Sequence, residues 1–306
     1  MKILVTGAGG FLGQRLVSVL RAQGHDVWGV TRRSRAAQSD YDLVLDDPLE
    51  PERYANIVGQ NGIETTINAL AAGVDPRERD IGLLVRVNSV FPALLAAAVA
   101  SAGATNFIQI GSSAEYAPLQ GKGYIPEEAP LTQDKLYGGT KAAGSVLLRT
   151  VAAEVGLRAC VLRLFNIYGP GEKAHRLFPS LLGRLSRGER VPLSAGSQVR
   201  DFLYVDDACL AIARMIRALP ENPPVAGVYN LASGRAVSVR EFAVAIADAI
   251  GADRQLLAFG ELAMRPDDLP YIVADTRRLD DLIGPAASIT IAMAVRSILG
   301  QPGGAG

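Results

Sequence analysis

Short runs rich in β-branched residues alternate with longer helical patterns through the first half of the chain. Strand-like runs include "KILVTG", "DVWGVT", "TTINAL" and "NFIQIG", and helical periodicity appears in segments such as "GFLGQRLVSVLRAQG" and "KAAGSVLLRTVAAEVG". Strands and helices that alternate in this way form βαβ units, in which helices cover both faces of a parallel sheet. Because such crossovers are right-handed, the pattern predicts an α/β fold with a doubly wound parallel sheet.

The pattern changes after Asn166, where glycine and proline interrupt the chain between two clear helices, at 178–187 and 239–250. A chain of 306 residues is also long for one hydrophobic core. We therefore predict two parts. Residues 1–166 form the parallel-sheet domain, and residues 167–306 form mainly a smaller lobe, with segments that return to the first domain.

The charges of the chain balance, with 31 basic and 31 acidic residues. This balance removes any global electrostatic reason to bind nucleic acid or an anionic membrane surface. The longest apolar run, "FPALLAAAVASAGA", is shorter than the roughly 20 residues that span a bilayer, so it predicts a buried helix. The N-terminal "MKILVTG" enters a strand without the apolar region of a signal peptide, and we expect a cytoplasmic protein.

The two cysteines, Cys160 and Cys209, form no CxxC pair, and the chain has only two histidines. Neither a disulfide framework nor a metal site is indicated. Both thiols are expected to be small buried hydrophobic groups in a reducing compartment.

The stretch "VTGAGGFLG" places Gly7, Gly10 and Gly13 between the first strand and the first helix, with Phe11 and Leu12 inside the turn. Gly7 permits a tight turn, Gly10 lets the backbone approach a pyrophosphate, and Gly13 allows close packing of helix on sheet. The N–H groups at the helix N-terminus suit the anion. The stretch predicts a Rossmann site for a dinucleotide, and a tight turn without a ligand is the alternative.

The end of the second strand carries no acidic residue for the adenosine ribose. Thr31 stands at that place, and three arginines follow it: Arg32, Arg33 and Arg35. Arginines there suit a 2′-phosphate, so we expect NADP(H) as cofactor, with NAD(H) as the second choice. The alternative is that these arginines form a solvated loop. At the end of the third strand, Asp46 or Asp47 suits an adenine amino group, although acidic residues at strand ends also cap turns.

The order of three motifs, the glycine turn, "GSSAEY" after a strand and "YGGTK" on the next helix, resembles the extended short-chain dehydrogenase/reductase family. This family includes nucleotide-sugar epimerases, dehydratases and ketoreductases. The resemblance covers nearly the whole chain and includes "INALAAG", "RVNSVFPALLAAA", "LRLFNIYGPG", "RDFLYVDDA", "VYNLASG" and "RPDDLPYIVADTRRL". The chain looks most like the branch of GDP-4-keto-6-deoxymannose reductases.

The resemblance implies that Tyr137 exchanges a proton with the substrate oxygen while hydride moves between the same carbon and the nicotinamide. A tyrosine pKa near 7 instead of about 10 requires roughly 4 kcal/mol of preference for the phenolate. The Lys141 ammonium, one helical turn away at about 5 Å, supplies about 3 kcal/mol at an effective dielectric near 20, and it also holds the nicotinamide ribose. Ser112 takes the hydrogen bond to the reacting oxygen and Ser113 contacts the substrate, although either serine also fits a loop cap. Without the cofactor turn, the Tyr137–Lys141 spacing fits a solvated helix start equally well.

The resemblance also assigns residues to the rest of the site. On the cofactor side these are Ala71, Ala72 and Asn88. On the substrate side, Arg200 and Arg265 match positions that clamp a diphosphate, and Asn166 matches a position that meets its oxygens. Guanidinium groups suit phosphate geometry. Each arginine alone also fits a surface ion pair, with Asp201 or Asp267 as partner.

Three functions stay open. The first is a ketoreductase that moves hydride from NADPH to the C4 carbonyl of a nucleotide-linked 4-keto-6-deoxy sugar. The second is a 4-epimerase with bound NAD, and the third is a non-catalytic dinucleotide sensor, against which the Ser/Tyr/Lys set argues. Dehydration is disfavoured, because Ser113 and Ala114 replace the acid pair that eliminates water. Helices that are apolar on more than one face predict a homodimer through a four-helix bundle.

Overall fold

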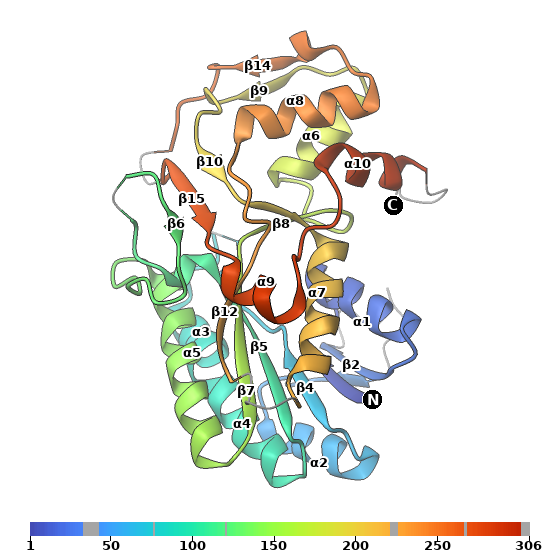
Figure 1. Ribbon diagram of the computed structural model, residues 1–306, viewed down its shortest axis with the longest axis vertical. Coiled ribbons are helices and arrows are strands. Elements are labelled where there is room, and N and C mark those ends of the chain that lie inside the picture. The colour runs from blue at the N-terminus through green and yellow to red at the C-terminus, as the bar shows by residue number, and fades with distance from the viewer. Residues whose placement is uncertain (33–42, 76, 120, 221–225, 266–267, 301–306) are drawn as a thin grey trace.

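The computed structural model describes residues 1–32, 43–75, 77–119, 121–220, 226–265 and 268–300. In this part of the chain, seven strands form one parallel sheet in the order β12-β7-β5-β4-β1-β2-β3 (Figure 1). The strands are β1 (Lys2–Thr6), β2 (Asp26–Arg32), β3 (Leu43–Leu45), β4 (Thr65–Asn68), β5 (Asn106–Ser112), β7 (Arg158–Leu164) and β12 (Gly227–Leu231). The predicted doubly wound α/β fold is confirmed.

Helices cover both faces of this sheet, because successive residues of its strands point to opposite faces. In β1, Ile3 and Val5 belong to the same core as Leu16, on the face covered by α1 (Phe11–Ala22) and α7 (Val205–Ala218). Leu4 between them packs in a second core with Tyr54. That face is covered by α2 (Pro51–Asn61), α4 (Phe91–Ser101) and α5 (Leu136–Glu154).

The strand order reverses direction at β1, which has β2 on one side and β4 on the other. Doubly wound proteins bind ligands in the crevice at such a point, beyond the carboxyl ends of the strands. Buried polar side chains line these strand ends. The Thr6 hydroxyl donates to Asn68 Oδ1 at 2.6 Å, and the Asn68 amide donates to Gln109 Oε1 at 2.9 Å. The polar groups under the crevice are therefore paired with one another.

The long apolar stretch forms three consecutive segments, α3 (Ile81–Leu84), the π-helical η2 (Val85–Val90) and α4. Pro92 has no N–H to donate to the Asn88 carbonyl four residues earlier. Helix α5 approaches this carbonyl so closely that a Cβ at Gly144 would overlap its oxygen. By length and composition Ile81–Ser101 passes as a membrane span, but 56% of its most apolar window is buried inside the protein, as in core helices of soluble proteins.

The smaller lobe lies above the large sheet in Figure 1. Its helices α6 (Leu177–Ser186) and α8 (Val239–Ile250) confirm the two helices predicted after residue 166, and α10 (Ile291–Leu299) packs against α8. Its strands are β6 (Tyr124–Ile125), β8 (Asn166–Tyr168), β9 (Val191–Leu193), β10 (Val199–Arg200), β11 (Phe202–Tyr204), β13 (Val237–Ser238), β14 (Leu257–Phe259) and β15 (Tyr271–Ala274). Strand β12 and helix α9 (Arg277–Ile283) return to the large sheet. The domain division at residue 166 stays a prediction.

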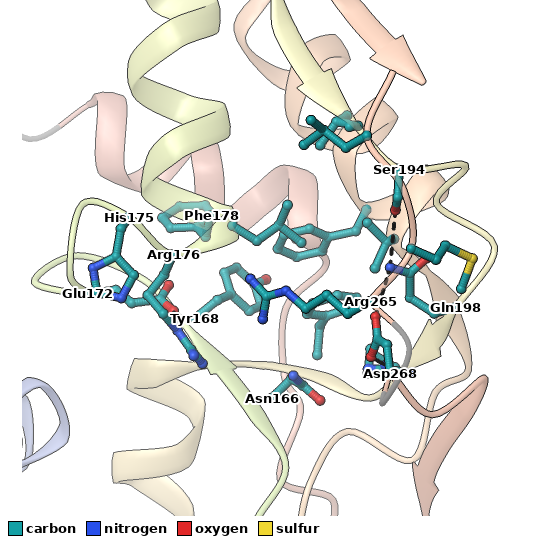
Figure 2. A pocket seen from close by; sticks show the side chains of 18 of the residues that line it. Asn166, Tyr168, Glu172, His175, Arg176, Phe178, Ser194, Gln198, Arg265 and Asp268 are labelled. Atoms are coloured by element: carbon teal, nitrogen blue, oxygen red, sulfur yellow. Dashed lines mark hydrogen bonds and ion pairs between the residues drawn. The ribbon is translucent and has the colours of Figure 1, made fainter. Parts of the chain in front are cut away.

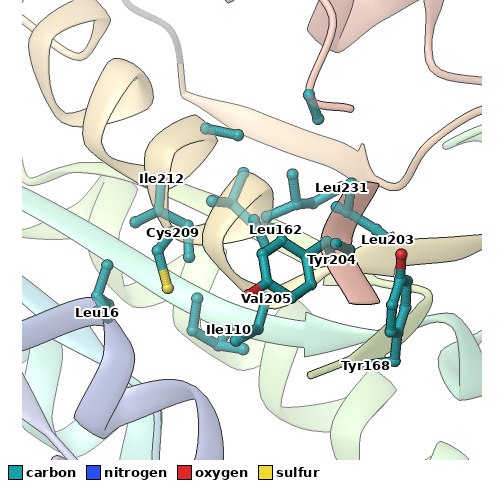
Figure 3. Close-up of a cluster of buried hydrophobic side chains, with 14 of the residues drawn as sticks. Leu16, Ile110, Leu162, Tyr168, Leu203, Tyr204, Val205, Cys209, Ile212 and Leu231 are labelled. Carbon is teal, nitrogen blue, oxygen red and sulfur yellow. The ribbon is translucent and has the colours of Figure 1, made fainter. Parts of the chain in front are cut away.

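One hydrophobic core runs from α1 and α7, along one face of the sheet, into the smaller lobe. Cys209 of α7 lies in this core among side chains of α1, β5 and β7 (Figure 3). In the lobe, Phe242 of α8 meets Tyr168 of β8 edge to face, with ring centroids 5.1 Å apart. Cys160 and Cys209 are both free and buried, as expected.

The first turn of α5 lies directly on the turn that follows β5. A Cβ at Gly138 would overlap the carbonyl oxygen of Ala114 and would lie 2.7 Å from Thr132 Cγ2. A Cβ at Gly139 would meet only the Thr132 carbonyl oxygen, at 4.0 Å. Packing therefore requires the first glycine of "YGG" and not the second.

Gly138→Ala is expected to lower the free energy of unfolding by about 1–3 kcal/mol, because the helix or the turn must shift to relieve the overlap. Gly139→Ala is the matched control, and removing glycine from a helix interior there should stabilise by about 0.5–1 kcal/mol. Urea unfolding of both variants measures the difference. Equal stability of the two variants would contradict the packing described.

Candidate active site

The chain turns sharply between β1 and α1 at Gly7, whose φ is 67°. A Cβ at Gly7 would lie 2.8 Å from a backbone oxygen after β4, and a Cβ at Gly13 would overlap the Gly7 carbonyl oxygen. Helix α1 begins at Phe11 with Gly10 as N-cap, and no side chain caps its first N–H groups. Leu12, partly buried like Phe11, packs against the core below. The glycines thus keep side chains away from N–H groups that suit a pyrophosphate.

The end of β2 lies beside this turn, since the Ala8 N–H donates to the Val30 carbonyl at 3.0 Å. Thr31 is buried there and Arg32 is exposed. Two of the predicted arginines lie outside the described residues: Arg33 and Arg35. The structure therefore places Thr31 and Arg32 at the strand end where the adenosine ribose of a dinucleotide lies in this fold class.

The predicted residues after β3 and β4 differ in their surroundings. Asp46 and Asp47 are both exposed, and the Asp47 carboxylate accepts the Leu49 N–H at 2.9 Å, so Asp47 caps a turn. Ala71 is exposed and Ala72 is buried, both on the segment that leaves β4 at the crevice. Of the two acidic residues, Asp47 thus takes the role of a turn cap, the alternative considered for it.

Asn88 is buried and connects two elements of the site. Its side chain accepts the Ala72 N–H at 3.0 Å and donates to the Ala72 carbonyl at 2.9 Å and to Thr140 Oγ1 at 3.1 Å. Gly73 follows directly, and a Cβ there would lie 3.2 Å from the Tyr137 ring. Asn88 therefore supports the site by holding the exit of β4 against the start of α5.

Ser112 ends β5, and its hydroxyl lies beside the Tyr137 hydroxyl. The Ser112 hydroxyl accepts an N–H of the following 3₁₀ turn (Ser113–Glu115) at 3.1 Å and also hydrogen-bonds Tyr137. Burial raises the pKa of Tyr137, and the hydrogen bond with Ser112 opposes this rise. The structure thus brings Ser112 to the tyrosine, while Ser112 also caps the loop.

The pKa shifts of Tyr137 and Lys141 differ from the expectation. Its buried Nζ donates to the Ile110 carbonyl at 2.6 Å, and the pKa of Tyr137 is raised, not lowered toward neutrality. Burial lowers the pKa of Lys141 itself. The prediction that Lys141 brings the Tyr137 pKa near 7 is wrong for this arrangement, because burial raises the pKa of the phenol and Lys141 is not among the groups that lower it.

A pocket of about 390 Å³ opens among β8, β10, α6 and the segment 262–265 (Figure 2). One wall is aromatic, with Tyr168, Phe178, Phe202 and Phe242. Three of the four predicted substrate residues line it: Asn166, Arg200 and Arg265. The fourth, Ser113, is not among the lining residues and begins the 3₁₀ turn after β5. An aromatic wall beside guanidinium groups suits a ligand with a flat ring and a phosphate.

Arg200 is buried and forms an ion pair with Asp268, across 68 residues of sequence. Burial lowers the pKa of Arg200, and Asp268 opposes this effect. The neighbouring Asp201, considered as a partner, is instead fully buried and accepts the Ser233 hydroxyl at 2.6 Å and three backbone N–H groups. Asp267 lies outside the described residues.

Sequence reasoning missed three pocket residues from the segment between β8 and α6: Glu172, His175 and Arg176. Arg176 Nε donates to Glu172 Oε1 at 3.2 Å, and burial raises the pKa of this glutamate. Burial is the main cause of the raised pKa of Tyr137, and the charge of Arg176 opposes this rise. The available signal was the cluster of charged residues in "EKAHR", directly after "NIYGPG".

The same segment reaches the cofactor side of the crevice. A Cβ at Gly171 would lie 3.7 Å from the Phe11 ring, at the start of α1. Lys173 Nζ lies 3.7 Å from Asp75 Oδ2, on the segment after β4. The pocket and the crevice therefore share one wall.

The residues at the crevice fit a dinucleotide: three glycines, the uncapped start of α1, and Tyr137 and Lys141 facing the strand ends. When bound, such a cofactor supplies or accepts hydride. Among the described residues, no three His, Cys, Asp or Glu side chains are grouped so that they could hold a metal ion.

Comparison with known proteins decides the family. Residues 3–232 match the model of the NAD dependent epimerase/dehydratase family. The chain belongs to this family. Its members are oxidoreductase-type enzymes of the extended short-chain dehydrogenase/reductase kind, so the predicted family and the prediction of an enzyme are confirmed.

Individual family members match over much of their length. A dTDP-glucose 4,6-dehydratase of Streptomyces griseus is 28% identical over 95% of this chain and 90% of its own. A 3-diazoavenalumate denitrifying reductase of Streptomyces sp is 34% identical over 68% of this chain and 69% of its own. Among solved structures, MoeE5 in complex with UDP-glucuronic acid and NAD is 28% identical, with a TM-score of 0.82 over 96% of both chains.

Proposed function

We propose that this family member reduces the C4 ketone of a nucleotide-linked 4-keto-6-deoxy sugar, with NADPH as hydride donor. The observation that carries the proposal is the hydrogen-bonded Ser112–Tyr137 pair next to a pocket lined by Arg176, Arg200 and Arg265. The arginines supply the local positive charge that a neutral protein needs to hold a diphosphate. A nucleotide sugar is bound by MoeE5, whose structure is similar.

In the proposed reaction, Tyr137 gives its proton to the C4 oxygen as hydride arrives at C4. Ser112 hydrogen-bonds the same oxygen and so stabilises the charge that develops on it. Burial raises the pKa of Tyr137, which keeps the phenol protonated and suits a proton donor. The Lys141 side chain is held by the Ile110 carbonyl beside this pair.

Net reduction is favoured over the other reactions of the family for three reasons. Ala114 stands where a dehydratase needs a proton-exchanging acid. Thr31, without a carboxylate, stands where an NAD-binding strand carries an acid, which favours NADPH and reduction. The reductase of Streptomyces sp, 34% identical, shows that related chains carry out reduction. A 4-epimerase with tightly bound NAD is the second candidate, supported by the NAD of MoeE5.

The proposed reductase works in the cytoplasm, where the NADPH pool supplies hydride.

The proposed reductase also forms a homodimer. Apolar side chains are exposed on the η2–α4 stretch and on α5: Val90 and Leu94 on the first, and Val146 and Leu147 on the second, each 41–52% exposed. Exposed apolar side chains grouped on two helices indicate a protein interface.

Turnover by the wild type and by the Tyr137→Phe variant tests the proposed reduction. NADPH oxidation should occur with a nucleoside diphosphate 4-keto-6-deoxy sugar, and Tyr137→Phe should lose at least about a hundredfold in kcat because the proton is gone. Cofactor affinity of the variant, measured by fluorescence titration, should stay within a few fold. A Tyr137→Phe enzyme with activity within tenfold of the wild type would place the proton donor elsewhere. An NAD equivalent that stays bound through purification would favour the epimerase.

Thr31→Asp tests the choice of cofactor. The wild type is expected to prefer NADPH over NADH, and the variant should reverse the preference, because the new carboxylate repels a 2′-phosphate and accepts ribose hydroxyls. The ratio of kcat/KM values for the two cofactors measures the effect. Thermal unfolding serves as the control, since Thr31 is buried. A folded variant with an unchanged ratio of kcat/KM values would mean that the end of β2 does not distinguish NADPH from NADH by the 2′-phosphate.

Leu147→Glu tests the homodimer. Light scattering of the wild type should give twice the chain mass of 32.3 kDa, and the variant should give a single chain mass, because a charge cannot be buried unpaired in an apolar interface. Leu210→Glu on α7, where the wild-type leucine is 39% exposed, is the matched control and should stay dimeric. A wild-type monomer at micromolar concentration would refute the dimer.

A further inference from the structure

A buried ion pair lies directly behind the proposed catalytic residues. The Glu115 side chain is fully buried, the Arg163 side chain is 4% exposed, and Arg163 Nε donates to Glu115 Oε2 at 2.8 Å. An ion pair that loses its water in this way is often no more stabilising than hydrophobic residues of the same volume. Stability alone is therefore a weak reason for this pair.

Glu115 connects the elements that carry the site. Its Oε1 accepts the backbone N–H of Ser112 at 2.9 Å, and its Oε2 accepts the Ser145 hydroxyl at 2.8 Å. Ser145 follows Lys141 by four residues, as Lys141 follows Tyr137, so these three residues share one face of α5. The carboxylate thus holds the end of β5 against the catalytic face of the helix.

The residues around the Glu115–Arg163 ion pair leave space for both side chains and contact them. A Cβ at Gly111 would lie 2.6 Å from Glu115 Oε1, so glycine makes room for the carboxylate. Arg163 Nη1 donates to the Glu127 carbonyl at 3.2 Å, and the guanidinium carbon lies 4.4 Å from the centre of the Tyr116 ring. Both partners are therefore fixed by contacts beyond their own ion pair.

We propose that Glu115 is a positioning residue of the enzyme, whose carboxylate is held by Arg163, fixes Ser112 and supplies negative charge that favours the buried Lys141 ammonium beside Tyr137. This inference rests on the proposed function. The described charged groups around Tyr137 and Lys141 are Glu115 after β5, Arg163 on β7 and Arg176 before α6.

The directions of the pKa shifts agree with this role. Burial lowers the pKa of Lys141, and the Glu115 carboxylate raises it. Burial also raises the pKa of Tyr137, Ser112 opposes this rise, and Glu115 adds to it. Both effects of Glu115 keep a proton in the site: on the ammonium and on the phenol. Removing its charge should therefore make both groups lose their protons at lower pH.

Glu115→Gln is the first test, because it keeps the shape of the side chain and removes the charge. We expect kcat to fall between about tenfold and a hundredfold as Ser112 loses its fixed position. We also expect the alkaline limb of the kcat/KM profile to move to lower pH. Ser145→Ala is the matched control: it removes one hydrogen bond and keeps the charge, so it should lower kcat without moving the limb. A limb that stays in place in Glu115→Gln would overturn the proposal.

A second measurement needs no substrate. The phenolate absorbance of Tyr137 is obtained across pH as the difference between each protein and its Tyr137→Phe derivative, and Tyr137 should titrate at lower pH in Glu115→Gln than in the wild type. An unchanged titration would overturn the role of Glu115. A lowered titration in a protein that reduces no keto sugar would support Glu115 while rejecting the proposed function. If Glu115→Gln does not fold, Glu115→Gln/Arg163→Gln leaves neither charge unpaired, and a smaller shift in the same direction is expected, because the loss of the Arg163 charge opposes the loss of the carboxylate.

Discussion

Two contacts between glycines of α5 and backbone carbonyls decide where the chemistry of this protein takes place. Gly138 rests on the Ala114 carbonyl and Gly144 on the Asn88 carbonyl, each without space for a Cβ. Helix α5 therefore has a single position against both the turn after β5 and the π-helical segment. The Tyr137–Ser112 hydrogen bond and the direction of Lys141 follow from that position, since all three side chains leave elements that these contacts fix.

The repeated strand and helix patterns were sufficient to predict the sheet and the glycine turn, because each depends on local sequence. The resemblance to the family, and not these patterns, placed Ser112 and Tyr137 together. The pKa shifts of Tyr137 and Lys141 were not predictable, because they depend on how far burial removes water from the phenol and the ammonium. The ion-pair partner of Arg200 was also not predictable. Asp201 is adjacent in the sequence, but the fold places Asp268, from a distant segment, against the guanidinium. Pocket residues of the "EKAHR" segment have no periodic pattern that would have indicated them.

Buried carboxylates of this neutral protein join segments that are far apart in the sequence. Asp201 collects donors from two later segments, and Asp207 of α7 accepts the Ser288 N–H at 2.9 Å. Glu115 does the same around the site. Because a buried carboxylate must have its hydrogen bonds satisfied, each one specifies which segments meet. A balanced net charge therefore says little about where the charges act.

The segment between β8 and α6 touches both halves of the site, through Gly171 beside Phe11 and through Lys173 beside Asp75. Such a shared wall makes the two binding equilibria members of one thermodynamic cycle. A ligand that shifts this segment from one half of the site changes the affinity for the ligand of the other half. Thermodynamic linkage then requires the second ligand to change the affinity for the first by the same factor. Gly171 and Lys173 are the residues through which such a coupling between the two halves would pass.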